Sequence, residues 1–406
     1  MTEPGAEPHS LIGNAALMKM AMSGIDLAPL SQKLLARAAA DPHDANALMD
    51  MSTVLQLTGN RELALVMQMQ ALEVQTLYRL PVKSGATGVR LLALMAPGDL
   101  MANTPLDCLL ENSDVALDML YVGQGLPLPP ELPDHDLLFV AIGENDQNCQ
   151  LLVEIADVIK DWPRPVLNPP ERAVWTSREG ACAKLRSAPG TVMPGTARIE
   201  RQTLERIGRA ELPITAVLDD GAFPIIVRPI ESHAGKGLAK LDAPVNIAGY
   251  LGAMPQDEFY VSSFIDYRGQ DGQFRKYRIV LIDGHPYACH MGISDDWMIH
   301  YLNAGMAESA EKRAEEAHFM AGFDEDFGRR HAAAFQVINE RMMLDYLIID
   351  CGETPDGKLL IFEVDTSAVV HALDAVDLYP YKQPQMQKVF AAFRTMLGTA
   401  VQRNVT

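Results

Sequence analysis

The segment DYLIIDCGETPDGKLLIFEVD, residues 345–365, does most to decide the fold. Two apolar runs flank a turn that carries Pro355, Asp356 and Gly357, and this pattern predicts a β-hairpin. Asp350 closes the first strand, while Glu363 and Asp365 lie two residues apart on the second. Residues two apart on a strand face the same side, so Glu363 and Asp365 should project together, with Asp350 across the ladder from them.

These three carboxylates predict a metal site. In an otherwise apolar sheet they would repel one another strongly unless a cation neutralised them. Carboxylate oxygens without nitrogen or sulfur ligands suit Mg²⁺ or Mn²⁺, which such sites share with the phosphates of a substrate. The alternative is that the three side chains lie on the solvated face of an edge hairpin, and the hairpin alone does not decide between the two.

A second informative segment is FPIIVRPIESHAGKGL, residues 223–238. Arg228 stands at the end of a predicted buried strand, and a loop with Gly235 and Gly237 follows directly. Glycines let backbone N–H groups approach phosphate oxygens, and a cation at the strand end can neutralise them. The loop is not a Walker A motif, since neither serine nor threonine follows Lys236. A plain surface turn is the alternative.

A basic hairpin is predicted for FRKYRIVLIDGHPYACHMGI, residues 274–293, because Asp283-Gly284 is a strong hairpin turn signal. Lys276 and Arg278 share one face of its first strand. A transferring phosphoryl group needs such cations to stabilise its developing charge. An exposed basic strand is the alternative.

The order of these segments resembles the ATP-grasp superfamily, and especially D-alanine–D-alanine ligase, glutathione synthetase and the ribosomal-protein glutamate ligases. In that family a V-K-P strand leads into a glycine-rich lid, a later strand forms the adenine hinge, and a hairpin of the form D…DG…E-x-N binds two magnesium ions. Here VRP (227–229), YVSSFI (260–265) and the hairpin from Asp350 to Asp365 match in that order. The resemblance covers residues 88–400.

The resemblance implies ATP and Mg²⁺ (or Mn²⁺) as cofactors. Asp350, Glu363 and Asp365 would hold the metal, and their spacing favours Asp350 over Asp345. Arg278, Arg228 and Lys276 would act on the transferring phosphoryl group. The implied nucleotide-binding residues are Arg178, Arg228, Ser232, His233, Gly235, Lys236, Gly237, Ser262, Ser263, Phe264 and Ile265. Contacts to the other substrates would come from His290, Trp297, His300, Thr366, Ser367 and His371.

The sequence departs from the family pattern in four respects. Arg228 and Arg178 stand where the family has phosphate-binding lysines, and an arginine holds phosphate in a different, bidentate geometry. Asp365 replaces the usual asparagine, which adds one negative charge beside the metals. Ser262 and Ser263 stand where the hinge has an acidic residue. These departures bear on activity more than on nucleotide binding.

The fold class implied by the whole pattern is mixed α+β. We expect a helical region at 1–85, a parallel α/β pre-ATP-grasp subdomain at 86–172 and an ATP-grasp domain at 173–406. The lid lobe of that domain would span 180–262, and its metal-binding lobe 263–400. The helical region resembles one tetratricopeptide hairpin, with a plain helical bundle as the alternative. The residues behind that resemblance are Leu48, Met51, Ser52, Leu55, Gly59, Ala64, Ala71 and Leu72.

Composition limits the partners. A net charge of −19 disfavours nucleic acid and anionic membranes. The five scattered cysteines and the lack of a signal-like N-terminus predict a cytoplasmic protein with free thiols. By resemblance, the chain would join a carboxylate to an amine or another nucleophile through an acyl phosphate, on a small molecule, peptide or protein, as a homodimer. The alternatives are a kinase acting on a hydroxyl, and a non-catalytic nucleotide-binding adaptor that docks proteins through its helices.

Overall fold

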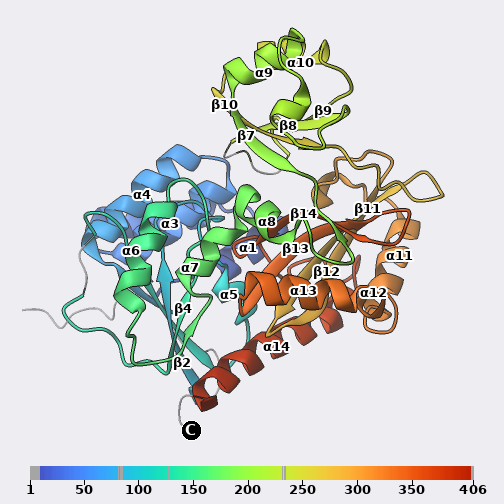
Figure 1. The fold of residues 1–406 in the computed structure, drawn as a ribbon. Helices are drawn as coiled ribbons and strands as arrows, with labels where there is room; N and C mark the ends of the chain where they lie inside the picture. The colour runs from blue at the N-terminus through green and yellow to red at the C-terminus, as the bar shows by residue number, and fades with distance from the viewer. Residues whose placement is uncertain are drawn as a thin grey trace, which may run out of the picture. The chain divides into compact units, whose positions relative to one another are not determined.

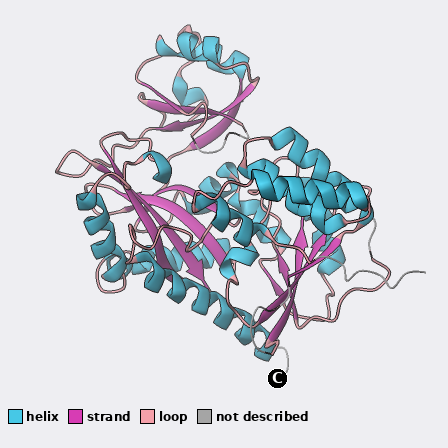
Figure 2. Cartoon of the chain, turned by 180° about the vertical axis from the view of Figure 1, so that it is seen from behind, coloured by secondary structure: helices cyan, strands magenta, loops and turns pink. Residues whose placement is uncertain are grey.

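The computed structural model describes residues 10–80, 82, 86–126, 129–230, 232 and 235–403, which have the predicted mixed α+β class (Figures 1 and 2). The chain divides into two compact units. Unit 1 comprises Met1–Ala173, Leu344–Tyr346 and Thr366–Thr406, and unit 2 comprises Val174–Met343 and Leu347–Asp365. Within the described residues, no helix has the length and apolar character needed to cross a bilayer.

Unit 1 begins with the predicted helices. They are α1 (Asn14–Met22), α2 (Ala28–Ala40), α3 (Ala45–Leu57) and α4 (Arg61–Val74). Gly59 makes the turn between α3 and α4 with a φ of 83°, a backbone conformation that favours glycine. Leu17, Leu34 and Val54 lie in the apolar core between the helices. The helical content and the break at Gly59 are therefore as predicted, while the tetratricopeptide likeness stays a prediction.

The sheet of unit 1 has the strand order β1-β3-β2-β4-β5. Its strands are β1 (Leu77–Leu80), β2 (Val89–Met95), β3 (Val115–Tyr121), β4 (Leu137–Val140) and β5 (Val166–Leu167). Strands β2 to β5 run parallel, as predicted, but β1 pairs antiparallel with β3 and was not foreseen. From β2 the chain continues to β3 on one side and later returns to β4 on the other. The carboxyl end of β2 is thus the point at which open α/β sheets form a crevice.

Further helices complete unit 1. They are α5 (Leu106–Leu109), α6 (Cys149–Ile159), α7 (Pro170–Ala173) and the long C-terminal α14 (Lys382–Arg403). The ring of Phe393 on α14 lies 5.9 Å from that of Phe139 on β4 and 5.4 Å from that of Tyr346. These contacts put α14 with the parallel sheet, although we expected residues 366–400 to belong to the metal-binding lobe.

One part of unit 2 is a four-stranded antiparallel sheet of order β7-β10-β8-β9, drawn in green at the top of Figure 1. Its strands are β7 (Thr196–Glu200), β8 (Ile225–Pro229), β9 (Ala239–Leu241) and β10 (Glu258–Ser263), and α9 (Arg201–Gly208) and α10 (Asn246–Ala253) join it. Leu204, Val227, Ile247 and Phe259 share its apolar core. Sequence patterns indicated β8 and β10. They did not indicate β7, β9 or the two helices.

The other part of unit 2 is a sheet of order β12-β11-β13-β14-β6. Its strands are β6 (Thr191–Val192), β11 (Phe274–Ile282), β12 (His285–Ser294), β13 (Tyr346–Glu353) and β14 (Leu359–Asp365). The first residue of β13, Tyr346, is assigned to unit 1. Both predicted hairpins are present, and the turn residues Asp283 and Gly284 have positive φ.

The helices beside this sheet are α8 (Arg178–Leu185), α11 (Ala310–Ala321), α12 (Phe327–Arg330) and α13 (Ala332–Met342). His331 separates α12 from α13, so the helical stretch from Phe327 to Met342 is interrupted there. The buried His331 ring nitrogen Nε2 lies 3.2 Å from the carboxylate of Glu353, a contact that sequence periodicity does not reveal.

Candidate functional site

The predicted carboxylates lie on the β13–β14 hairpin of unit 2. Asp350 pairs directly with Glu363, and Ile348 pairs with Asp365. Glu363 and Asp365 are half-buried on one face, whereas Val364 between them is buried in the core. The predicted position of Asp350 across the ladder from Glu363 is therefore confirmed.

Asp350 is held by two cations from β11. Arg278 donates from Nε to Asp350 Oδ1 at 2.7 Å and from Nη2 to Oδ2 at 2.9 Å. The Lys276 ammonium lies 2.8 Å from Oδ2, and Asp350 is only 2% exposed. Burial alone would raise the pKa of Asp350, but the charges of Arg278 and Lys276 outweigh it and hold that pKa well below its usual value.

Glu363 lies between this cluster and a third cation. Arg178, at the start of α8, donates from Nη2 to Glu363 Oε2 at 2.5 Å. The Ser177 hydroxyl accepts a hydrogen bond from Gly180 N–H and fixes the first turn of α8, so it orients Arg178. Burial alone would raise the pKa of Glu363, but the positive charges of Arg178 and Lys276 outweigh burial. The pKa of Glu363 therefore lies below its usual value.

The neutralising charge that we expected from a metal ion thus comes from side chains of the chain itself. In the part of the chain that the structure describes, no three His, Cys, Asp or Glu side chains are grouped as a metal site. Both oxygens of Asp350 pair with Lys276 and Arg278, so Asp350 does not join Glu363 and Asp365 as a third metal ligand in this arrangement. Glu363 and Asp365 have the donor chemistry that a hard divalent cation needs. Asp350 fits the same ion only if its two basic partners turn to another anion.

A fourth cation, Arg228, lies at the end of β8. Its Nε donates to Ser232 Oγ at 3.2 Å, and its Nη2 donates to the carbonyl of Ser232. Burial and the neighbouring charge of Arg178 lower the pKa of Arg228 to about 10. Two guanidinium groups whose charges act on each other, one of them with a depressed pKa, form a site that an anion would stabilise.

The loop after β8 needs its glycines. Gly235 and Gly237 have φ angles of 75° and 71°. A Cβ on Gly237 would lie 2.9 Å from the Pro229 ring, and one on Gly235 would lie 3.1 Å from Met298 Sδ. Lys236 between them is exposed, and predicted loop residue His233 lies outside the described residues.

The predicted hinge is at the end of β10. Ser262 pairs with Ile226 of β8, Ser263 pairs with Ile225, and the Phe264 N–H donates to the Pro224 carbonyl at 3.0 Å. Ile265 follows, half-buried. The Phe264 and Trp297 rings pack edge to face, with their centroids 5.8 Å apart. The predicted substrate residue Trp297 therefore lies at the hinge.

The other predicted substrate residues of unit 2 lie near Arg278. His290 pairs with Arg278 across the β11–β12 ladder, and its ring lies 4.5 Å from the Tyr301 ring. The hydroxyl of Tyr301 donates to the fully buried Glu316 at 2.9 Å. Burial and the charges of Lys276 and Arg278 lower the pKa of His300, so its imidazole is neutral at physiological pH.

Three predicted residues belong to unit 1. Thr366 and Ser367 are buried, and the Nδ1 of His371 accepts a hydrogen bond from Leu373 N–H at 3.1 Å. Asp345, the rejected candidate for the metal, is also in unit 1, where it accepts a hydrogen bond from Asn168 N–H at 2.8 Å.

Two residues beside the glycine loop were missed. The Tyr250 hydroxyl of α10 donates to the Gly237 carbonyl at 2.8 Å. The Lys240 ammonium lies 4.6 Å from the centre of the Phe264 ring. The position of Lys240 on the strand directly after the loop could have suggested it, whereas nothing in the sequence pattern marks Tyr250.

No protein-family model and no curated protein matches this chain. Similar solved structures do exist. The D-alanine–D-alanine ligase of Bacillus anthracis complexed with ATP is 11% identical, with 78% of this chain and 99% of that chain covered and a TM-score of 0.47. VanG D-Ala:D-Ser ligase of Enterococcus faecalis is 11% identical, with 76% of this chain and 99% of that chain covered and a TM-score of 0.48. A RimK domain ATP-grasp protein of Sphaerobacter thermophilus is 16% identical, with 77% of this chain and 99% of that chain covered and a TM-score of 0.41. These are proteins of the kind that the sequence resembles.

Proposed function

We propose that unit 2 binds Mg²⁺-ATP and that the chain is an ATP-dependent ligase that activates a carboxylate as an acyl phosphate. The observation that carries this proposal is the set of four cations around Glu363. Arg178 bonds Glu363 directly, and the charges of Lys276 and Arg228 also act on it, while Arg278 holds the Asp350 opposite. A polyanion such as the ATP phosphates would give these cations stronger partners than single carboxylates.

Binding would proceed by an exchange of partners. Phosphate oxygens would take over Lys276 and Arg278, and Asp350, Glu363 and Asp365 would then be able to hold Mg²⁺. The ion would neutralise charge on the phosphates. Arg178 and Arg228 would contact the α- and β-phosphates, and the backbone at Gly235 and Gly237 would close over them.

The reaction would have two steps. An oxygen of the substrate carboxylate would attack the γ-phosphorus, and ADP would leave. An amine, or another nucleophile, would then attack the acyl carbon, lose a proton and displace inorganic phosphate. Closure of the loop after β8 would exclude water from the acyl phosphate. His300, whose charge is disfavoured by burial and by Lys276 and Arg278, stays a candidate for contact with the reacting substrate.

ADP release tests the proposal. The chain would be supplied with Mg²⁺-ATP and a panel of free amino acids and dipeptides, and the products would be identified by mass spectrometry. We expect ADP and a new amide, with a hydroxamate replacing the amide when hydroxylamine is added. ADP with a phosphorylated hydroxyl and no hydroxamate would identify a kinase. Nucleotide binding without ADP release under any condition would identify an adaptor and reject the ligase.

A further inference from the structure

Lys276 of β11 acts on two carboxylates of the β13–β14 hairpin within unit 2. Its ammonium lies 2.8 Å from Asp350 Oδ2, and Asp350 pairs directly with Glu363 across the ladder. Burial would raise the pKa of Glu363, and the charges of Arg178 and Lys276 lower it. One ammonium group therefore compensates negative charge on both strands of the hairpin.

The two cations that hold Asp350 are not equivalent. The planar guanidinium of Arg278 bonds both carboxylate oxygens, at 2.7 and 2.9 Å, in the geometry that suits a carboxylate. Lys276 offers a compact charge on a flexible stem and contacts Oδ2 alone. Its side chain is 22% exposed, whereas that of Asp350 is 2% exposed. Lys276 is thus the partner that can leave while Arg278 still compensates Asp350.

The ammonium of Lys276 and a divalent cation would compete for the same carboxylates. Both are compact cations that need oxygen atoms as partners. The charges that act on Glu363 are those of Arg178, Lys276 and Arg228, against the single carboxylate of Asp350. A divalent cation that approaches the ligand-free cluster therefore meets an excess of positive charge, while a polyanion meets an attraction.

We propose that the ammonium of Lys276 excludes divalent cations from the ligand-free site and admits them only after a polyphosphate has drawn it away from Asp350. This inference rests on the proposed function, because it concerns the order in which the same site takes phosphates and metal. It makes Lys276 an autoinhibitory contact toward the metal. The polyphosphate itself then binds without any metal ion.

The test is one substitution that should change two affinities in opposite directions. Lys276→Met is made in the full chain. Binding of Mn²⁺ alone is followed by electron paramagnetic resonance, and binding of inorganic tripolyphosphate by calorimetry in the presence of a chelator. We expect Mn²⁺ affinity to become about tenfold stronger, because a competing charge beside the carboxylates is lost. Tripolyphosphate affinity should become about tenfold weaker, because a charge-assisted contact is lost. Damage to the site would weaken both.

Two controls test the role of the charge. Lys358→Met removes an exposed lysine in the turn of the same hairpin and should leave both affinities unchanged. Lys276→Arg keeps the positive charge and should keep Mn²⁺ excluded. Should Lys276→Met fail to fold, Lys276→Gln decides the question, since its amide can still donate to Asp350.

A double variant locates the ion. Carboxylates on the surface of a chain with a net charge of −19 bind some Mn²⁺ in every variant, so only the difference from the unmodified chain counts. Adding Glu363→Gln to Lys276→Met should abolish the gain in Mn²⁺ affinity. A gain that persists in the double variant places the ion elsewhere and overturns the inference.

The remaining outcomes separate this inference from the proposed function. Equal Mn²⁺ affinity in the unmodified chain and in Lys276→Met overturns the exclusion and leaves the ligase proposal standing. Failure of the unmodified chain to bind tripolyphosphate without metal overturns the order of binding. A gain in Lys276→Met together with no ADP release from the unmodified chain supports the exclusion and rejects the ligase.

Discussion

Arg278 holds both oxygens of Asp350 in a bidentate pair, at 2.7 and 2.9 Å, on neighbouring strands of one sheet. Asp350 is 2% exposed, so its charge depends on this partner and on Lys276. Removing one member of a buried ion pair leaves the other charge uncompensated, which destabilises proteins far more than the loss of a surface pair.

We therefore predict that Arg278→Met lowers the free energy of unfolding by about 3 kcal/mol. Asp350→Asn in the same chain should restore part of that loss, because the buried carboxylate that lost one of its two cations is then neutral, while Lys276 keeps the charge of Glu363 nearby. The measurement is urea unfolding of the single and double variants. Arg268→Met, which removes an exposed pair with Asp266, is the control and should change stability by less than about 1 kcal/mol. Equal effects of Arg268→Met and Arg278→Met would contradict the buried character of the Asp350 site.

The carboxylates on β14 should differ in their effect on activity. Glu363 contacts Arg178 and faces Asp350, so we predict that Glu363→Gln reduces ADP release at least 100-fold, as expected when a charge-stabilising group is lost. Asp365→Asn introduces the asparagine of the ATP-grasp pattern that the sequence resembles, and it should retain ADP release. Asp356→Asn, in the exposed turn of the same hairpin, serves as the control. A loss in Asp365→Asn as large as that in Glu363→Gln would mean that the negative charge of Asp365 is itself required for ADP release.

Arg228 should matter for nucleotide binding and little for stability. Burial and the charge of Arg178 lower its pKa to about 10, so the group stays protonated at neutral pH but its charge is less favourable in the folded, ligand-free protein than in the unfolded chain. We predict that Arg228→Met changes the free energy of unfolding by no more than about 1 kcal/mol, because a poorly compensated charge is lost. Calorimetric titration with ATP should show affinity weakened at least tenfold, since a charge-assisted contact to phosphate is lost. Unchanged affinity would remove Arg228 from the phosphate site.

Sequence patterns predicted the elements of this site better than its contacts. The strand alternation placed Lys276 with Arg278 and Glu363 with Asp365, because side-chain direction on a strand follows from spacing of two. That β11 lies beside β13 could not be predicted, since the two strands are separated by more than sixty residues of chain and no local rule fixes their order. The pairing of Asp350 with Arg278 depends on that order. As a result the sequence predicted a metal ion, or else a solvated face, for these carboxylates, while the structure supplies counter-charge from β11.

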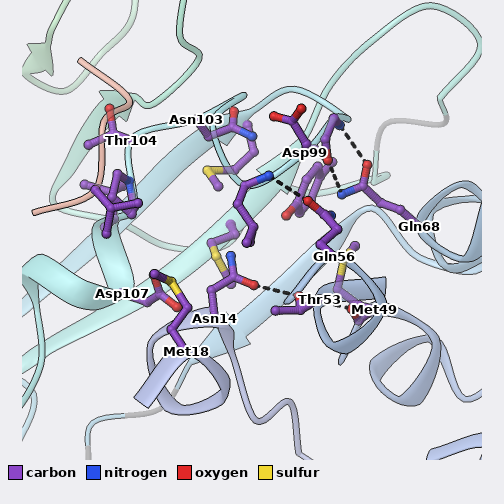
Figure 3. Close-up of a pocket in the computed structure, with 18 residues that line it drawn as sticks. Asn14, Met18, Met49, Thr53, Gln56, Gln68, Asp99, Asn103, Thr104 and Asp107 are labelled. Atoms are coloured by element: carbon purple, nitrogen blue, oxygen red, sulfur yellow. Dashed lines mark hydrogen bonds between the residues drawn. The ribbon is translucent and has the colours of Figure 1, made fainter. Parts of the chain in front are cut away.

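The same limit applies to unit 1. The sequence predicted a helical region at 1–85, yet nothing in its pattern indicated that Gln68 bonds Gly98 (Figure 3). A buried glutamine on a helix with many apolar positions is a local exception whose reason lies in another part of the chain. Likewise we expected the segment after Asp365 to belong to the same lobe as the β14 carboxylates. The structure assigns Thr366–Thr406 to unit 1, which contains the parallel sheet.

A last prediction concerns Asp50, a carboxylate of α3 that is 1% exposed. It accepts hydrogen bonds from Ile12 N–H at 2.9 Å and Gly13 N–H at 3.1 Å, the two residues that directly precede α1. Burial outweighs these hydrogen bonds and raises the pKa of Asp50 to about 6, from an ordinary value of 3.8. The folded state therefore binds a proton more tightly than the unfolded state, and stability falls as the pH rises from about 4 through 6.

Asp50→Asn removes this titration while its amide oxygen can still accept from Ile12 and Gly13. We predict that the variant gains stability relative to the unmodified chain by roughly 3 kcal/mol between pH 4 and pH 7, since a shift of about two pKa units corresponds to that free energy. Urea unfolding at a series of pH values measures the difference. Asp26→Asn is the control, because Asp26 also accepts a backbone hydrogen bond, from Ala28, but is exposed. A difference between the Asp50 variant and the unmodified chain that does not change with pH would show that Asp50 stays ionised throughout, with the positive end of α1 compensating its burial.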